Sequence, residues 1–333
     1  MNKLIFLSLS LLVSSNVFAA NILRFNIYKS PIGIKWNNPK KLSRMTAINT
    51  LLAGKHEFGH TLGHLSISTK CDSGIEFHTG MERTDLTESK DLVFNKGSGL
   101  GTLVHNFKGN LEDEKKVKAS VAYSLDKRRG RDINFIEFII SDKACARAYE
   151  YFNAFKESKT WLNYGMTNNP RACEGSGCTA FGKSFLEIIG FNDDELLSQW
   201  RGEVNLPREI LGAHSTKLYK DSHDEANELL DTGYYVKIAK LANPLSKRIK
   251  WHSSNEKAKA VTIMYYSPDD MHKWIKKEYK KKNSKYQTRK FRKKGRAKVV
   301  TIDIRDLATP TEPFFTEDCS QVENVNVEKF TKD

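Results

Sequence analysis

The chain has 333 residues and a formal net charge of +14, with 54 Lys and Arg against 40 Asp and Glu. This length suffices for a full enzyme core, or for one domain with a sizeable extension. Beyond the N-terminus no stretch approaches the roughly 18 consecutive apolar residues that a membrane-spanning helix requires, so we predict no membrane span.

The N-terminus has the organisation of a secretory signal peptide. It begins with Met-Asn-Lys, continues with an apolar run from Leu4 to Val13, and reaches a small-x-small site that ends at Ala19. These three parts in this order are typical of a secretory signal. We therefore expect residues 1–19 to be removed, with Ala20 as the alternative cleavage site, and the protein to be exported to the periplasm or secreted from the cell.

The cysteine content fits an exported protein. Oxidising compartments favour disulfides, and an odd count leaves at least one thiol unpaired or in an intermolecular bridge. Two disulfides with one free thiol at Cys178 is the economical arrangement, although the sequence leaves the connectivity open. The cysteines are Cys71, Cys145, Cys173, Cys178 and Cys319.

Hydrophobic periodicity predicts a mixed α+β protein, because runs with a period of two alternate with runs of helical period. Turn residues and helix caps separate these runs. The predicted strands, in chain order, begin at Ile22 and continue as 65–68, 75–78, 117–125, 133–140, 234–241, 260–266 and 299–304. The predicted helices are 42–52, 143–156, 178–189, 193–200 and one that begins near Met271.

The first motif in the chain is His56-Glu57-Phe-Gly-His60, which matches the HExxH pattern. Histidines four residues apart share one face of a helix and can bind zinc, while the glutamate acts as a general base. The continuation resembles the metzincin pattern, but Ser66 stands where that pattern has its third histidine. Few residues precede the motif, compared with the sheet that such proteases build before it. A zinc protease that uses His56, Glu57 and His60 is therefore an alternative hypothesis.

A second interpretation begins at His64. Leu65–Ser68 alternates apolar and polar residues, so His64 stands at the start of a strand. On the next predicted strand Glu76 and His78 share one face. A turn between the two strands would bring His64 and His78 side by side as a base and the residue that orients it, which a nucleophilic thiol needs. Glu76 is the fallback for the orienting residue, and His60 is the fallback for the base.

Cys178 is the candidate for that thiol. It opens a predicted amphipathic helix that ends at Gly190, directly after a segment containing Gly175 and Gly177. Unpaired N–H groups and the helix dipole favour a negative charge in the first turn of a helix, which lowers the pKa of a thiol there. The alternative is a small buried residue at a helix start, or one half of a disulfide.

Two motifs together resemble a known family. Gly63-His64-Leu-Ser-Ile-Ser is similar to the histidine strand, and Glu-Gly-Ser-Gly-Cys178-Thr-Ala-Phe-Gly-Lys-Ser-Phe-Leu-Glu-Ile-Ile-Gly to the cysteine helix, of the circularly permuted papain-like enzymes. That group is related to NlpC/P60 peptidases and to lecithin–retinol acyltransferase, and in it the histidine strand precedes the cysteine helix. His78 matches the third polar position of the family more weakly. The resemblance covers roughly residues 60–190.

The resemblance implies a permuted papain-like core in residues 20–205, in which an antiparallel sheet packs against the helix that carries the cysteine. Residues 206–333 would form a C-terminal extension. The implied activity is that of a cysteine hydrolase or acyltransferase without a cofactor, acting on an amide, peptide or ester bond of a peptide, cell-wall or lipid acyl substrate. Cys178 would be the nucleophile, His64 the base and His78 the orienting residue.

Most of the net charge lies in residues 273–298, which contain 14 Lys and Arg and one acid, Glu278. A basic run with interleaved aromatic rings can bind anionic polymers, and an exported protein also meets anionic membrane surfaces. No motif for sequence-specific nucleic-acid recognition is present. A third hypothesis is therefore a non-catalytic protein that binds anionic surface polymers, and the plain alternative for this segment is a solvated, partly disordered helix and linker.

Overall fold

The computed structural model describes residues 21–36, 39–53, 60, 62–84, 87–88, 103, 105–126, 133–207, 260–291 and 296–319. The predicted signal peptide, the predicted strand at 234–241, and the motif residues His56 and Glu57 lie outside these ranges. In the described part of the chain, no helix combines the length and the apolar character needed to cross a membrane.

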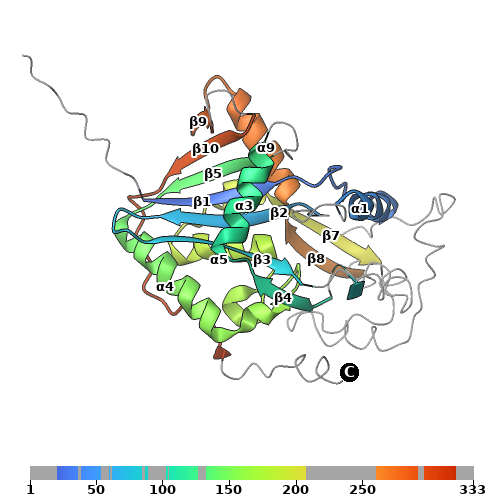
Figure 1. Ribbon diagram of the computed structural model, residues 1–333, viewed down its shortest axis with the longest axis horizontal. Coiled ribbons are helices and arrows are strands. Elements are labelled where there is room, and N and C mark those ends of the chain that lie inside the picture. The colour runs from blue at the N-terminus through green and yellow to red at the C-terminus, as the bar shows by residue number, and fades with distance from the viewer. Residues whose placement is uncertain are drawn as a thin grey trace, which may run out of the picture.

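One large sheet organises the structure, with the strand order β6-β4-β3-β2-β1-β5-β10-β9 (Figure 1). Neighbouring strands are antiparallel except β5 and β10, which are parallel. The strands are β1 Ile22–Tyr28, β2 His64–Lys70, β3 Glu76–Arg83, β4 Phe107–Leu111, β5 Ile133–Ile139, β6 Asn163–Tyr164, β9 Gln287–Lys290 and β10 Lys298–Asp303. A separate antiparallel pair is formed by β7 Arg201–Pro207 and β8 Ala260–Tyr266.

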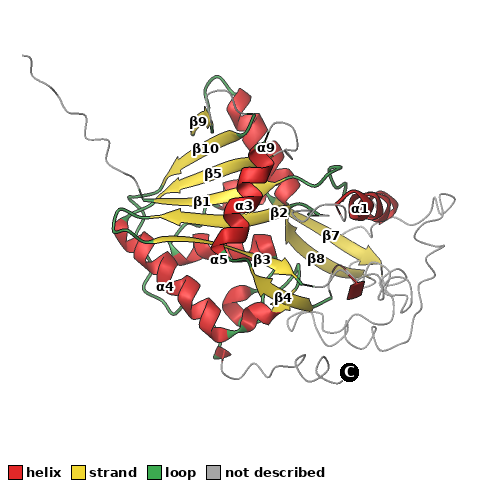
Figure 2. Ribbon diagram, in the orientation of Figure 1, coloured by secondary structure: helices red, strands yellow, loops and turns green. Residues whose placement is uncertain are grey.

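Helices cover both faces of the sheet, with α3 in front of the strands and α4 and α5 behind them in the view of Figure 2. The helices are α1 Pro39–Ala53, α3 Glu114–Leu125, α4 Asp142–Ser158, α5 Cys178–Ile188, α6 Asp194–Ser198 and α9 Pro268–Lys280, with short 3-10 turns at Thr160–Leu162 and Pro170–Ala172. Helices and a large sheet thus form the α+β protein that the periodicity predicts.

The two faces of the sheet differ in polarity. Phe25 and Leu65 point to the side of α5 and belong to the main hydrophobic core. On the other face Asn26 donates hydrogen bonds to the hydroxyl groups of Ser66, at 3.1 Å, and Ser68, at 2.9 Å. A shift of β2 by one residue would exchange these two sets of side chains, so the alternating pattern fixes the register of β1 and β2.

The prediction of a strand at 117–125 is wrong, because these residues belong to helix α3. The side chain of Asp113 caps this helix by accepting a hydrogen bond from the backbone N–H of Lys116 at 2.7 Å. The apolar residues of the segment fit either period, since Val117, Val121 and Leu125 are also spaced for one face of a helix. The N-cap favours the helix.

The C-terminal part of the chain is not an appendage, because β9 and β10 complete the large sheet and α9 packs on its core. The expected boundary between residues 205 and 206 falls inside β7. The basic composition of the segment conceals an apolar stripe on α9, where Met271, Trp274 and Ile275 are buried at positions i, i+3 and i+4.

The cysteines adopt the economical arrangement. Cys71 is bonded to Cys145 and Cys173 to Cys319, and Cys178 is free and buried. Two disulfides are compatible with a protein that resides in an oxidising compartment. Cys178 is thus not half of a disulfide, and its thiol is available for chemistry.

Candidate active site

The start of β2 places His64 where two strands of the sheet separate. Pairing between β2 and β3 ends at Ser66 and Gly80, and β3 then pairs with β4 instead. The turn into β2 needs the residue before His64 to be a glycine, because Gly63 has a φ of +81°, and a Cβ there would lie 3.0 Å from the carbonyl oxygen of Tyr28. His64 therefore stands at the open end of a fork in the sheet.

The loop before α5 places Cys178 at the same fork. Its backbone lies directly against β6, since the N–H of Ser176 donates to the carbonyl of Asn163 at 3.0 Å. Gly175 has a φ of +91°, and a Cβ there would lie 2.2 Å from the same carbonyl oxygen. Because the loop is fastened in this way, the helix begins at Cys178 with its sulfur directed to the start of β2.

Three donors contact the sulfur of Cys178: the side chain of His64, the backbone N–H of Leu65 and the hydroxyl group of Tyr164. Burial has the largest effect on the pKa of the Cys178 thiol and raises it. The hydrogen bonds and the positive charge of His64 together outweigh burial, so the pKa of the thiol lies below its ordinary value. Burial, and after it the contact with an anionic sulfur, raise the pKa of Tyr164, which keeps its hydroxyl protonated.

Glu112 occupies the other side of the His64 ring. Its Oε2 lies 2.7 Å from Nε2 of His64, and both side chains are buried. Burial has the largest effect on the pKa of His64 and lowers it, but the charge of Glu112 and the hydrogen bond to Cys178 raise it, and the result is a pKa of about 10. The bond to Nε2 leaves Nδ1 as the ring nitrogen that faces the sulfur.

Two features of the sheet hold Glu112 in place. Its backbone N–H donates to the carbonyl of Gly80 at 2.9 Å, which extends the pairing of β3 and β4 by one residue. Its carboxylate then lies over Gly80, where a Cβ would come within 2.0 Å of Oε2. Only glycine leaves room for the carboxylate at that position.

His78 does not take the orienting position that we predicted for it, because Glu112 occupies that position. Nδ1 of His78 is 2.9 Å from the hydroxyl of Ser68, and Nε2 is 3.0 Å from Glu76. His78 pairs with Ser68, which lies four residues from His64, or about 13 Å at the rise of a β-strand. Glu76, the fallback for the same role, lies farther still from His64 along the strand.

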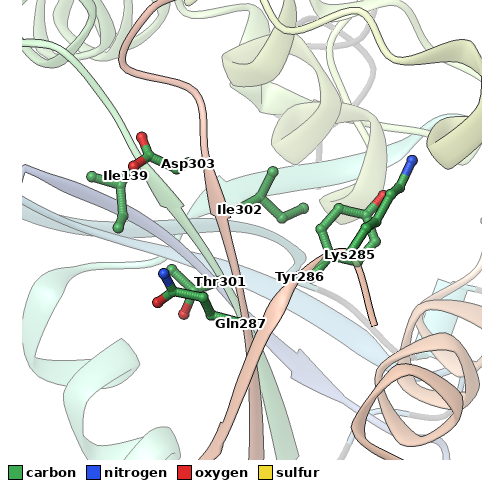
Figure 3. Close-up of a pocket in the computed structure, with 7 residues that line it drawn as sticks. All are labelled: Ile139, Lys285, Tyr286, Gln287, Thr301, Ile302 and Asp303. Atoms are coloured by element: carbon green, nitrogen blue, oxygen red, sulfur yellow. The ribbon is translucent and has the colours of Figure 1, made fainter. Parts of the chain in front are cut away.

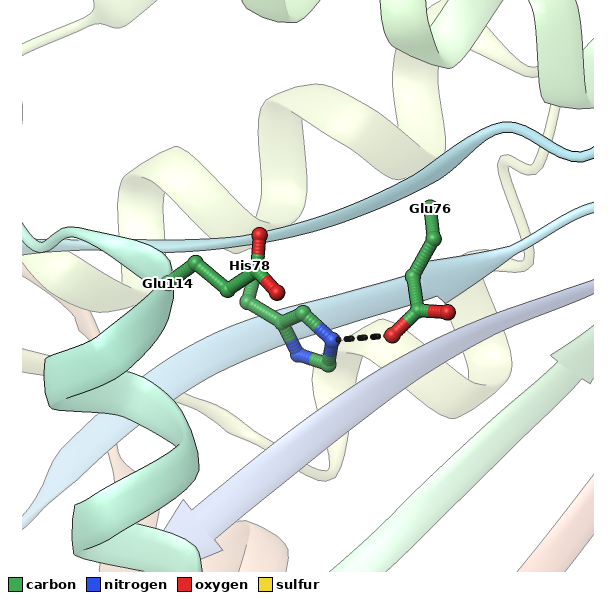
Figure 4. Close-up of side chains that lie close together, drawn as sticks. All are labelled: Glu76, His78 and Glu114. Atoms are coloured by element: carbon green, nitrogen blue, oxygen red, sulfur yellow. Dashed lines mark hydrogen bonds and ion pairs between the residues drawn. The ribbon is translucent and has the colours of Figure 1, made fainter.

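His78 instead belongs to a small cluster with Glu76 and Glu114 on the surface of the sheet, where ligand atoms of the three residues lie within 4.8 Å of one another (Figure 4). The ammonium group of Lys118 is 3.2 Å from Glu76 and 2.5 Å from Glu114. Since this lysine already pairs with both carboxylates and His78 contacts Glu76 at 3.0 Å, we assign no metal ion to the cluster.

His60 is the one residue of the HExxH motif that lies in the described ranges. Its ring stacks on the ring of His64, with centroids 3.9 Å apart and planes inclined by 15°. Tyr28 approaches both rings, with its centroid 5.5 Å from that of His60 and 5.7 Å from that of His64. His60 thus packs against the ring of His64, the candidate base.

A separate depression of about 310 Å³ lies at the far end of the sheet, between β9, β10 and the end of β5 (Figure 3). None of the predicted site residues lines it. It is lined by Ile139, Lys285, Tyr286, Gln287, Thr301, Ile302 and Asp303.

The C-terminal strap, residues 304–319, braces the segment that leads into Cys178. Cys319 is bonded to Cys173, five residues before Cys178. Arg171 donates to the carbonyl groups of Pro313 and Phe314, each at 3.1 Å, and its own carbonyl accepts from the N–H of Thr316 at 2.8 Å. The strap therefore holds the outside of the loop that positions the thiol.

We expect removal of this bridge to disturb the site as well as the fold. In a Cys173→Ser, Cys319→Ser double variant, loss of the disulfide should cost about 2–4 kcal/mol of unfolding free energy. Alkylation of Cys178 by iodoacetamide should also slow, because the loop before it loses its brace. The matched control is Cys71→Ser, Cys145→Ser, whose bridge starts at the other end of β2. Equal alkylation rates in the two double variants would show that the strap has no special role in the site.

Comparison of the chain with models of known protein families, with curated proteins and with solved structures found no match.

Proposed function

We propose that this protein is a cysteine hydrolase or acyltransferase of the permuted papain-like kind. One observation carries the proposal: a free, buried thiol is hydrogen-bonded to an imidazole whose other nitrogen is 2.7 Å from a buried carboxylate. A nucleophile, a base and a residue that orients the base, in contact in that order, are the groups that covalent acyl transfer needs.

In the first half of the reaction the thiolate of Cys178 forms a bond to the carbonyl carbon of the substrate. The C=O electron pair moves to oxygen, and its return breaks the bond to the leaving nitrogen or oxygen. The leaving group takes the proton from Nδ1 of His64. A thioester on Cys178 remains, and His64 is neutral, while Glu112 keeps Nε2 protonated and the ring in position.

In the second half neutral His64 removes a proton from water or from an acceptor hydroxyl or amine, which attacks the thioester and expels the thiolate. Water gives hydrolysis and another acceptor gives transfer. The backbone N–H groups in the first turn of α5 have no acceptor within the helix, although that of Cys178 already contacts the hydroxyl group of Tyr164. We assign stabilisation of the oxyanion to this turn. An acyl-bearing peptide, cell-wall component or lipid is the proposed class of substrate, and no cofactor is needed for these steps.

The proposal is tested by trapping the thioester. Incubation with an activated ester such as nitrophenyl acetate should release nitrophenol and add one acetyl group to Cys178, seen as an increase in intact mass that hydroxylamine removes. The Cys178→Ala variant should do neither, and a chelator should leave the unaltered protein unaffected. Hydrolysis that persists in Cys178→Ala and disappears with the chelator would overturn the proposal and favour the zinc protease.

A further inference from the structure

The basic segment lies at the edge of the sheet opposite β6. Helix α9, strand β9 and strand β10 occupy this edge, at the top of the view in Figure 1. Five cations here are exposed and have no carboxylate partner among the described residues: Lys277, Lys280, Lys282, Lys290 and Arg296. We call these five residues the basic edge. The single acid of the segment, Glu278, is buried and is 2.5 Å from Lys281 and 2.9 Å from the hydroxyl of Ser284.

Three aromatic rings of the segment, those of Trp274, Tyr286 and Phe291, pack against core residues. Trp274 is buried between Trp200 and Tyr286, with ring centroids 5.4 Å from each. Phe291 stacks on Phe135 with centroids 4.4 Å apart. These rings therefore belong to the core, and they do not form a platform on which nucleic-acid bases could stack. The remaining ring, that of Tyr279, is half-buried with the ammonium group of Lys298 5.5 Å from its centroid, so the main exposed feature of the segment is its charge.

This charge is one-sided. Lys277 and Lys280 lie on the outer side of α9, opposite the stripe that is buried on the sheet. Lys290 points to the same side. Thr288, two residues before Lys290 on β9, lies on the same face of the strand, and it pairs with Val300, which packs in the core with α9. Arg289 alternates to the other face of the sheet and is paired with the buried Glu137 at 2.7 Å. Among the described residues of the segment, Lys277, Lys280 and Lys290 thus lie on the α9 side, whereas Arg289 on the other face is paired.

The pairing of β9 with β10 also places two lysines at opposite positions. Lys290 and Lys298 stand directly opposite each other on β9 and β10, where like charges destabilise the pair. A lysine on an edge strand can serve to prevent pairing with other sheets. That role needs a cation on β9, but it does not account for the lysines of α9.

We propose that the basic edge docks the protein on an anionic phospholipid bilayer. A flat anionic surface engages cations that project from one side, whereas a polymer that wraps the edge would also use the α3 side, where Arg289 is already paired. Among the described residues no exposed large apolar side chain accompanies the cations, so we expect an electrostatic contact without insertion into the bilayer. Four strand spacings separate β9 from β2, so the candidate site lies about 20 Å from the docked edge. The proposal is independent of the proposed catalytic function.

The test is sedimentation with vesicles. The protein should bind vesicles that contain phosphatidylglycerol, should ignore vesicles of phosphatidylcholine alone, and should dissociate as salt is raised, because surface charges are screened beyond about 8 Å at physiological ionic strength. In a Lys277→Glu, Lys280→Glu, Lys290→Glu variant the affinity should fall at least about a hundredfold, given the contribution of each cation near an anionic surface. Cys178→Ala should bind as the unaltered protein does.

The matched control reverses three exposed lysines elsewhere, in a Lys70→Glu, Lys115→Glu, Lys143→Glu variant, which has the same net charge. It should retain most of the binding. Equal losses in the two triple variants would mean that net charge alone is responsible and would overturn the proposal. Binding to phosphatidylcholine, or binding to polyphosphate or nucleic acid without binding to anionic vesicles, would overturn it as well.

Discussion

Replacement of Glu112 by Ala should reduce the rate of thioester formation on Cys178 by about a hundredfold or more, as expected when the residue that orients a catalytic imidazole is lost. The carboxylate contacts Nε2 of His64 at 2.7 Å and helps to raise the pKa of that ring to about 10. Without the carboxylate of Glu112 the His64 ring can rotate, and the imidazolium loses its hydrogen-bonded counter-ion. The measurement is kcat/KM for an activated ester.

The matched variant is His78→Ala, which removes the histidine that the sequence favours but that contacts Ser68 and Glu76. We expect its kcat/KM to stay within about twofold of the unaltered value, as for a surface substitution. Because Glu112→Ala leaves a buried imidazolium unpaired and can destabilise the fold, Glu112→Gln serves as the second variant. It keeps an acceptor for Nε2 but loses the charge, so it should fold and should lower the alkaline limit of activity. A larger loss in His78→Ala than in either variant of Glu112 would contradict the assignment.

Replacement of His64 by Ala should make Cys178 about a hundredfold less reactive toward iodoacetamide near neutral pH. The hydrogen bond and the charge of His64 are the strongest of the effects that lower the pKa of the thiol. Without them burial dominates, and burial raises the pKa of a thiol above its ordinary value of 9.0. The rate of alkylation against pH measures this directly, since only the thiolate reacts.

The directions in which the pKa values of His64 and Cys178 shift define the pH range in which their ion pair stabilises the protein. The pKa of His64 is raised from 6.5 to about 10, so its contribution to stability is complete below about 6.5 and is lost as the pH rises through about 10. The pKa of Cys178 is lowered, so its contribution is present above 9.0 and is lost as the pH falls through the folded-state pKa. Alkylation should therefore become fast below the ordinary thiol pKa. An onset near 9 that is the same in His64→Ala would contradict the pairing.

Much of the site follows from local sequence patterns. His64 at the start of a strand and Cys178 at the start of a helix were predicted from alternation and from the helical spacing of Phe181, Phe185 and Ile188. Their contact depends on the fork between β2 and β3, which brings residues more than a hundred positions apart together. No local pattern encodes that distance, and here the resemblance to a family supplied the expectation.

The position of His78 could have been calculated from the hairpin. The turn between β2 and β3 pairs Lys70 with Glu76, and continuing that register places Glu82 opposite His64 and leaves His78 opposite Ser68. Glu112 could not have been found in this way, because it follows a strand that pairs with β3 from a distant part of the chain. A single glutamate before the N-cap Asp113 has the sequence context of an ordinary helix start.

For the basic segment, composition predicts exposure to solvent but conceals how the segment attaches to the core. Its composition predicts a solvated region, and Lys273, Lys277 and Lys280 are indeed exposed on α9. The three residues Met271, Trp274 and Ile275 nevertheless attach it to the core. Such a short apolar stripe is outweighed by charge in any average over the segment, although its i, i+3, i+4 spacing marks one face of a helix.

The most direct test of the central claim is the ultraviolet absorbance of the thiolate, followed during a pH titration. The other four cysteines are in disulfides, so the signal reports Cys178 alone. The account predicts a signal of one thiolate per chain that is already present well below pH 9, is absent in Cys178→Ala, and moves to higher pH in His64→Ala. A thiolate that appears only above pH 9 in the unaltered protein would show that Cys178 and His64 do not form an ion pair.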